Sequence, residues 1–174
     1  MKEKTVAESR TVMTEMIMPN DANPLGNLMG GYLMRWMDIA GGICASRHCE
    51  AHVVTVSVDH VSFKRPIKVG HVITITASVT RVFNTSLEVF IQVESGNPMR
   101  NERHLSNHAY FTFVALDDVT QRPLQIPRVV PETEDEQRLY ESAIRRRELR
   151  LVLAGRLEVD DAHEIKSLFR DAKA

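Results

Sequence analysis

The segment that most constrains the fold is residues 21–47, where a polar loop leads into a long apolar run. Three of the chain's eight glycines fall within six residues of this loop: Gly26, Gly30 and Gly31. Glycine is costly inside a helix but favourable where backbone must turn or approach another group closely. The pair at 30 and 31 therefore predicts a helix start with free, outward-pointing N–H groups. From Leu33 to Cys44 the helix is apolar nearly all round, which predicts burial.

A carboxylate lies on this helix. Asp38 follows Gly31 by seven residues, about two turns, and so returns to nearly the same helix face. A carboxylate on a buried helix needs a partner or a chemical role. One alternative is structural, an internal ion pair with Arg35, because buried carboxylates often serve the fold.

Composition narrows the class of protein. The chain has 174 residues, which is enough for one domain, or one domain with a tail. Its formal net charge of −1 predicts no nucleic-acid or membrane partner, and 43% hydrophobic residues predict a real core. No apolar leader begins the sequence and no stretch approaches a transmembrane length. We therefore expect a cytoplasmic protein.

The sequence contains no residue pattern typical of a metal site or a redox site. The two cysteines, Cys44 and Cys49, make neither a disulfide framework nor a metal cluster. The seven histidines lack metal-ligand spacing. We expect no metal and no cofactor.

Period-two alternation of apolar and polar residues predicts strands on both sides of the helix. The predicted strands are residues 10–18, 53–63, 71–82, 86–94 and 106–116. Three prolines make the segment to 131 an extended connector. Thr133 and Glu136 then form a capping box that starts a further helix, and a short helix is expected near 161–171.

These elements divide the chain into four parts. Residues 1–9 are expected to be frayed, 10–118 to form the main domain, 119–131 the connector, and 132–174 a C-terminal helical extension. A single helix that is apolar all round must be covered all round. A curved antiparallel sheet of about five strands covers one side, so a second subunit is expected to cover the other. This α+β architecture is the hotdog fold.

Several motifs also resemble a known family. They are DANPLGNLMGG followed by an apolar run with Asp38, then SFKRPIKVG, NTSLEV and VPETEDE. In this order and spacing, over roughly residues 10–148, the chain resembles the hotdog-fold acyl-CoA thioesterases. It is most similar to the bacterial acyl-CoA hydrolases related to the brain-type cytosolic enzyme. The resemblance implies hydrolysis of acyl-CoA to fatty acid and coenzyme A (CoA) by a hexamer of three dimers.

The residues suit that chemistry. Thioester hydrolysis needs an attacking water or carboxylate and donors for the oxyanion, whereas the thiolate leaves with little help. No Gly-x-Ser-x-Gly elbow is present. The N–H of Gly30 or Gly31 can polarise the carbonyl, aided by the helix dipole. The resemblance implies that Asp38 is the general base or nucleophile and that Asn23 acts from the partner subunit. Asn23 before Pro24 is also a good turn residue.

Coenzyme A carries phosphates that cations must meet. One candidate set is His60, near the end of the second predicted strand, with Lys64, Arg65 and Lys68 on the turn that follows it. A second flanks the hairpin turn: Arg81, Thr85 and Ser86. Both sets have plainer interpretations, since His60 suits a satisfied core histidine and basic turn residues are commonly just solvated.

Two other functions remain open. A hotdog hydratase or dehydratase acts on acyl thioesters, but such enzymes usually carry a histidine where the loop enters the central helix, and residues 19–37 contain none. A non-catalytic acyl-CoA sensor would need a DNA-binding or partner domain, and the segments outside the main domain are short for one.

Overall fold

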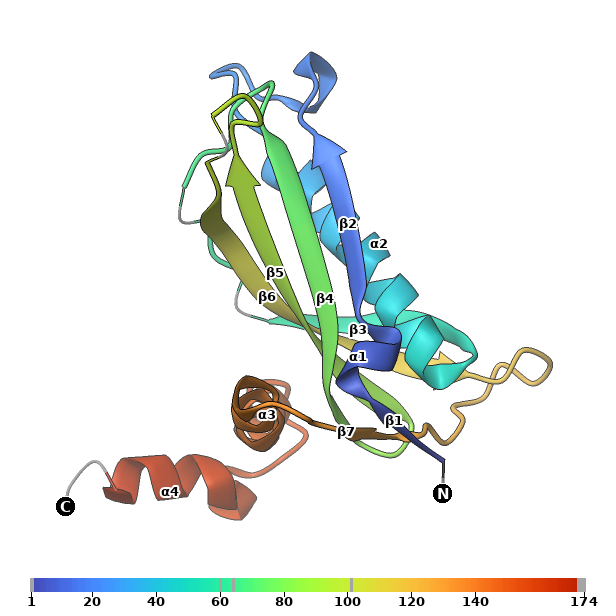
Figure 1. Cartoon of the computed structure of the whole chain (residues 1–174). Helices are drawn as coiled ribbons and strands as arrows, with labels where there is room; N and C mark the ends of the chain where they lie inside the picture. The colour runs from blue at the N-terminus through green and yellow to red at the C-terminus, as the bar shows by residue number, and fades with distance from the viewer. Residues whose placement is uncertain (1, 60, 64, 101, 172–174) are drawn as a thin grey trace. The chain divides into compact units, whose positions relative to one another are not determined.

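The structure, a computed structural model, describes residues 2–59, 61–63, 65–100 and 102–171 (Figure 1). Two compact units make up the chain, Met1–Val130 and Pro131–Ala174. The first unit holds the sheet and the long helix. The second holds α3 (Glu134–Leu153) and α4 (His163–Asp171).

The sheet of the first unit has five antiparallel strands in the order β2-β4-β5-β6-β3. Their bounds are β2 Thr11–Met16, β4 Val72–Val82, β5 Ser86–Gly96, β6 His104–Leu116 and β3 His52–Asp59. The long helix α2 spans Gly30–Cys49 and lies along one face of this sheet (Figure 1). The predicted hotdog fold is therefore confirmed, with each predicted strand present.

The core lies between α2 and the sheet. Alternate residues of the central strands point inward and are fully buried, among them Ile75, Ile91 and Phe113. Gly41 lets the helix approach this surface, because a Cβ atom there would lie 2.8 Å from Cδ1 of Ile91 and 3.0 Å from Cζ of Phe113. Both distances are shorter than packed carbon atoms allow.

The other face of α2 is open to solvent within one chain. Leu33 and Met37 are buried against the sheet, whereas Ile39 and Ile43 are 38% and 41% exposed, and Asp38 is exposed with them. The expectation that this helix and its carboxylate are buried all round is wrong for a single chain. The reason is geometric, since one sheet can cover only one side of a helix.

Residues 1–9 were expected to be frayed, but within them the structure has β1 (Glu3–Thr5) and α1 (Val6–Ser9). The strand β1 pairs in parallel with β7 (Arg128–Val130). Lys4 fixes the segment to the end of α2, because its ammonium donates to the Arg47 carbonyl at 2.7 Å and lies 2.9 Å from the Glu50 carboxylate.

The second unit contains both helices that the sequence predicts, and the first of them begins as predicted. The backbone N–H of Glu136 donates to Thr133 Oγ1 at 3.2 Å, and the Thr133 N–H donates back to the Glu136 carboxylate, so the predicted capping box is confirmed. Glu148 of α3 accepts the first N–H groups of α4, from Glu164 and Ile165. A carboxylate at this position complements the positive end of the helix dipole.

His48, near the end of α2, is fully buried. Its Nε2 lies 3.1 Å from the Pro127 carbonyl, which can only accept, so Nε2 carries the proton and Nδ1 accepts from the Ser9 hydroxyl at 3.3 Å. Burial lowers the pKa of His48 below its usual 6.5; the Pro127 bond raises it, Lys4 lowers it and Glu8 raises it. The native imidazole is therefore held neutral.

This burial predicts a pH-dependent stability. Because the pKa of His48 is lower in the folded than in the unfolded chain, the unfolded chain binds more protons below about pH 6.5. The free energy of unfolding should fall between about pH 7.5 and about pH 5, and fall less in His48→Gln, which cannot titrate. Denaturant titrations of both proteins across this range give the two slopes. Equal slopes would show that His48 contributes nothing.

Candidate active site

The loop before α2 is organised by Asn23. Its Oδ1 accepts the backbone N–H of Leu25 at 3.0 Å and that of Asn27 at 3.2 Å, while Gly26 adopts a left-handed φ of +73° between them. The turn interpretation of Asn23 is thus part of the structure. With Oδ1 used by the turn, the Nδ2 group has no acceptor among the described residues and can donate to a ligand.

The turn before β4 holds the other side of this loop. The N–H of Leu28 donates to the Ile67 carbonyl at 2.7 Å, and the N–H of Val69 donates to the Gly26 carbonyl at 3.2 Å. These bonds bring the segment around Arg65 beside the start of α2, although the two are far apart in sequence.

A cleft of about 350 Å³ lies where these segments meet. Its polar wall includes Asn23, Asn27 and Asn107, its apolar wall includes Leu33 and Phe63, and Gly30 and the exposed Arg65 also line it. Mixed walls of this kind, mostly apolar with a few polar groups, are typical of small-molecule sites.

The mouth of α2 supplies donors to this cleft. The N–H groups of Tyr32 and Leu33 are bonded to the Met29 carbonyl, whereas those of Gly30 and Gly31 have no acceptor within the described part of the chain. A Cβ atom at position 30 would lie 3.0 Å from the ring of Phe63, so glycine keeps this wall open. Free N–H groups at a helix start attract a developing negative charge.

Asp38 is held by a residue that the sequence analysis missed. The Thr55 hydroxyl on β3 donates to the Asp38 carboxylate at 2.6 Å. Thr55 pairs with Phe113 and Ser57 with Thr112, so the residue between them is the extra residue of a β-bulge. Bulges re-aim side chains near functional sites. Plain alternation gave no hint of this, because it assigns Thr55 to the polar side of the strand.

The cleft and the carboxylate do not meet within one chain. Gly31 and Asp38 are seven residues apart, or about 10 Å along the helix axis at 1.5 Å per residue. Asp38 does not line the cleft that holds Gly30, so the structure does not bring Asp38 together with the N–H groups of its own helix, and their joint action stays a prediction. Gly30 instead shares its cleft with Asn23.

The predicted phosphate-binding residues separate. Arg65 lines the cleft, whereas His60 and Lys64 lie outside the described residues. The hairpin set, Arg81, Thr85 and Ser86, lies at the far end of β4 from the turn that borders the cleft (Figure 1). Within one chain this set is therefore remote from the cleft.

Other reactive groups are locked inside the fold. Ser9 and His48 make a serine–histidine hydrogen bond, but both are fully buried, and the second ring nitrogen of His48 is bonded to Pro127. Burial raises the pKa of the Cys44 thiol to about 12 and that of Cys49 to about 12. Both thiols stay protonated and are poor nucleophiles. The described residues contain no group of three or more side chains suited to a metal ion.

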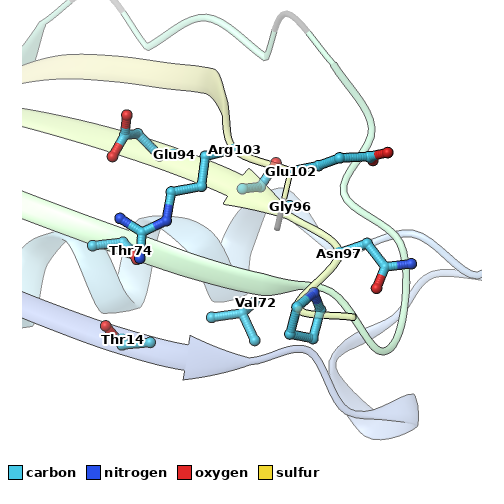
Figure 2. Close-up of a pocket in the computed structure, with 10 residues that line it drawn as sticks. Thr14, Val72, Thr74, Glu94, Gly96, Asn97, Glu102 and Arg103 are labelled. Carbon is cyan, nitrogen blue, oxygen red and sulfur yellow. The ribbon is translucent and has the colours of Figure 1, made fainter. Parts of the chain in front are cut away.

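A second hollow, of about 230 Å³, opens on the sheet face away from α2 (Figure 2). Thr14, Thr74, Glu94 and Arg103 line it, together with the loop after β5. None of its lining residues comes from α2, so it lies apart from the helix mouth and from Asp38.

Comparisons with known proteins place this chain in a family. The model of the thioesterase superfamily matches residues 25–101. The uncharacterized acyl-CoA thioester hydrolase YkhA of Bacillus subtilis is 41% identical over 139 residues, which are 80% of each protein. An apo-hexameric acyl-CoA thioesterase superposes with a TM-score of 0.86 at 37% identity, covering 88% of this chain and 98% of that one.

An acyl-CoA hydrolase from Staphylococcus aureus, solved with butyryl-CoA, CoA and CoA disulfide, has a TM-score of 0.83 at 33% identity and covers 95% of this chain and 98% of its own. That enzyme was also solved with one Asn, one Asp or one Thr replaced by alanine. The three positions follow the order and spacing of Asn23, Asp38 and Thr55.

The chain belongs to the thioesterase superfamily and is a thioester hydrolase with the hotdog fold. None of its described helices is both long and apolar enough to cross a membrane.

Removing the Thr55 hydroxyl should impair the enzyme without unfolding it. Thr55→Val deletes the 2.6 Å bond that orients the Asp38 carboxylate, and kcat for thioester hydrolysis should fall about 10- to 100-fold, the range for a hydrogen bond to a charged group. Thr55→Ser keeps the hydroxyl and should stay within about threefold of wild type. Initial-rate assays of both variants test this. A fully active Thr55→Val variant would rule out the positioning role.

Proposed function

We propose that this protein is an acyl-CoA thioesterase that converts an acyl-CoA and water to a free fatty acid and CoA. The observation that carries the proposal is that each chain holds two separate halves of an active site. One is the cleft with Asn23 and the unbonded N–H groups of Gly30 and Gly31. The other is the exposed carboxylate of Asp38, oriented by Thr55.

The chemistry needs only these groups. Asp38 takes a proton from the attacking water, or attacks the carbonyl carbon itself to form a mixed anhydride that water then hydrolyses. The oxyanion is stabilised by the N–H groups of Gly30 and Gly31 and by the Asn23 amide. When water attacks, the carbon–sulfur bond breaks as the tetrahedral intermediate collapses to the fatty acid. When Asp38 attacks, the same bond breaks as the mixed anhydride forms, before water hydrolyses that anhydride. In either route CoA leaves as a thiolate with the electron pair.

A second copy of the chain completes the site in this proposal. The strand β3 is an edge of the sheet, and Val54, Val56 and Val58 on it are exposed. The exposed side of α2 carries Ile39 and Ile43. A partner that covers these surfaces can bring its Asp38 to the cleft that its neighbour's Asn23 and Gly30 form. The hexameric relative supports a further assembly of three such dimers.

The comparisons support the residue assignment as well as the reaction. The three positions replaced by alanine in the Staphylococcus aureus hydrolase match Asn23, Asp38 and Thr55 in residue type and spacing. That hydrolase was solved with butyryl-CoA and CoA, which supports the same class of substrate here. Arg65, exposed at the cleft, is suited to meet a CoA phosphate.

The remaining expectations stay predictions: a cytoplasmic location, no cofactor, and phosphate contacts from the hairpin residues Arg81, Thr85 and Ser86. No feature of the described residues specifically favours the two alternatives, a hydratase or dehydratase on acyl thioesters and a non-catalytic acyl-CoA sensor.

The proposal is tested by Asp38→Asn. This change removes the base or nucleophile but keeps the side-chain shape, so kcat for acyl-CoA hydrolysis should fall about 10²- to 10⁴-fold, while CoA still binds. Release of free thiol measures the rate over acyl chains of increasing length, and calorimetry measures CoA binding.

A matched control is Asp118→Asn, which removes another exposed carboxylate, one that pairs with His52. The control should keep wild-type kcat. An Asp38→Asn variant with near wild-type kcat would refute the mechanism, and a wild-type protein that hydrolyses no acyl-CoA would refute the function.

A further inference from the structure

The inward-facing side chains of β6 change from apolar to polar at the strand end beside the start of α2. Phe113, Phe111 and Ala109 point inward and form part of the core. The next inward position is Asn107, a polar residue that is only 1% exposed. An amide in such a place is costly unless both of its ends are hydrogen-bonded.

Within the described part of the chain, one end of this amide is hydrogen-bonded and the other is not. Nδ2 of Asn107 lies 2.5 Å from the backbone carbonyl of Ser62. Because a carbonyl only accepts, the nitrogen must face Ser62, and this fixes the orientation of the amide. Among the residues that the structure describes, the other end, Oδ1, has no hydrogen-bond partner, and neither has the Ser62 hydroxyl. A buried unsatisfied acceptor of this kind destabilises the fold.

The unsatisfied oxygen belongs to a wall of the cleft. Asn107 lines the same space as Asn23, Gly30 and Arg65. The atom needs an N–H or O–H donor, so what approaches it has to carry one. Leu33 and Phe63 give the same cleft an apolar part of its lining, so the ligand segment must also be partly apolar.

We infer that Asn107 is a specificity residue that accepts a hydrogen bond from an amide N–H of the pantetheine arm of CoA. This inference rests on the proposed function. The arm joins apolar segments through two amides, which matches a cleft with apolar and amide walls, and its phosphate end suits Arg65. A fatty acyl chain has no N–H and would leave Oδ1 unsatisfied.

Access to the oxygen requires a side-chain movement at the cleft wall. Oδ1 is covered in the ligand-free fold. Phe63 lines the same cleft and is 58% exposed, so its ring can turn with little loss of packing. A shift of this kind on binding is common at interfaces with ligands.

The test compares two substrates that share one acyl group. The first is the acyl-CoA, and the second is the thioester of a simple alkyl thiol, which has no amide. For Asn107→Leu, kcat/KM on acyl-CoA should fall about tenfold, mainly through KM. The same variant should act on the alkyl thioester as wild type does.

A matched control is Thr112→Val. Thr112 also has a buried oxygen on β6 without a partner among the residues described, but its alternate position on the strand puts it on the opposite face, and it does not line the cleft. The control should leave both substrates unaffected. If Asn107→Leu does not fold, Asn107→Ser is used, because serine is also polar but its side chain is too short to place an acceptor where Oδ1 lies.

The outcomes separate this inference from the proposed function. Equal effects on both substrates, or no effect on either, would overturn the role of Asn107; no effect is also expected if a buried water satisfies the oxygen. If wild type hydrolyses no acyl-CoA, the proposed function fails instead. Calorimetry with CoA alone then decides the inference: a Kd raised about tenfold by Asn107→Leu but not by Thr112→Val supports it, and an unchanged Kd overturns it.

Discussion

The packing of one long helix against one face of a five-stranded sheet determines the rest of this structure. Gly41 allows close contact between α2 and the sheet, and the buried side of the helix completes the core. The same packing leaves the far side of the helix uncovered. Asp38 lies on that side, and Thr55 holds its carboxylate from the edge strand β3. The catalytic candidate is therefore placed at a surface that a second chain can cover.

Helix geometry then separates the two halves of the chemistry. The backbone positions of Gly31 and Asp38 are about 10 Å apart along the axis, and Asp38 does not line the cleft at the helix mouth. In the proposed dimer, the N-terminus of a helix and the carboxylate on that helix thus belong to two different active sites, and each works with the matching group of another chain. Pairing the cleft of one chain with the carboxylate of another gives each site both groups, and it agrees with the hexameric assembly of the acyl-CoA thioesterase that superposes on this chain.

Much of this could be predicted from the sequence, because periodicity reports local structure well. The central helix, the five strands and the capping box at Thr133 all followed from residue patterns. The sequence failed where a side chain's surroundings depend on long-range contacts. Asp38 was expected to be buried because an apolar helix does not reveal which side a single sheet covers. Thr55 was missed because alternation places it on the polar side of its strand, and Asn107 because its burial depends on the cleft.

The central claim is that each active site takes Asn23 from one chain and Asp38 from another. Co-expression of Asn23→Ala with Asp38→Ala tests this directly. Each variant alone should be nearly inactive, but random mixing makes half of the dimers mixed, each with one intact site. Activity should return to about a quarter of the wild-type level if the sites act independently. Mixed oligomers, verified by mass spectrometry, that remain as inactive as either variant would show that both residues act within the same chain.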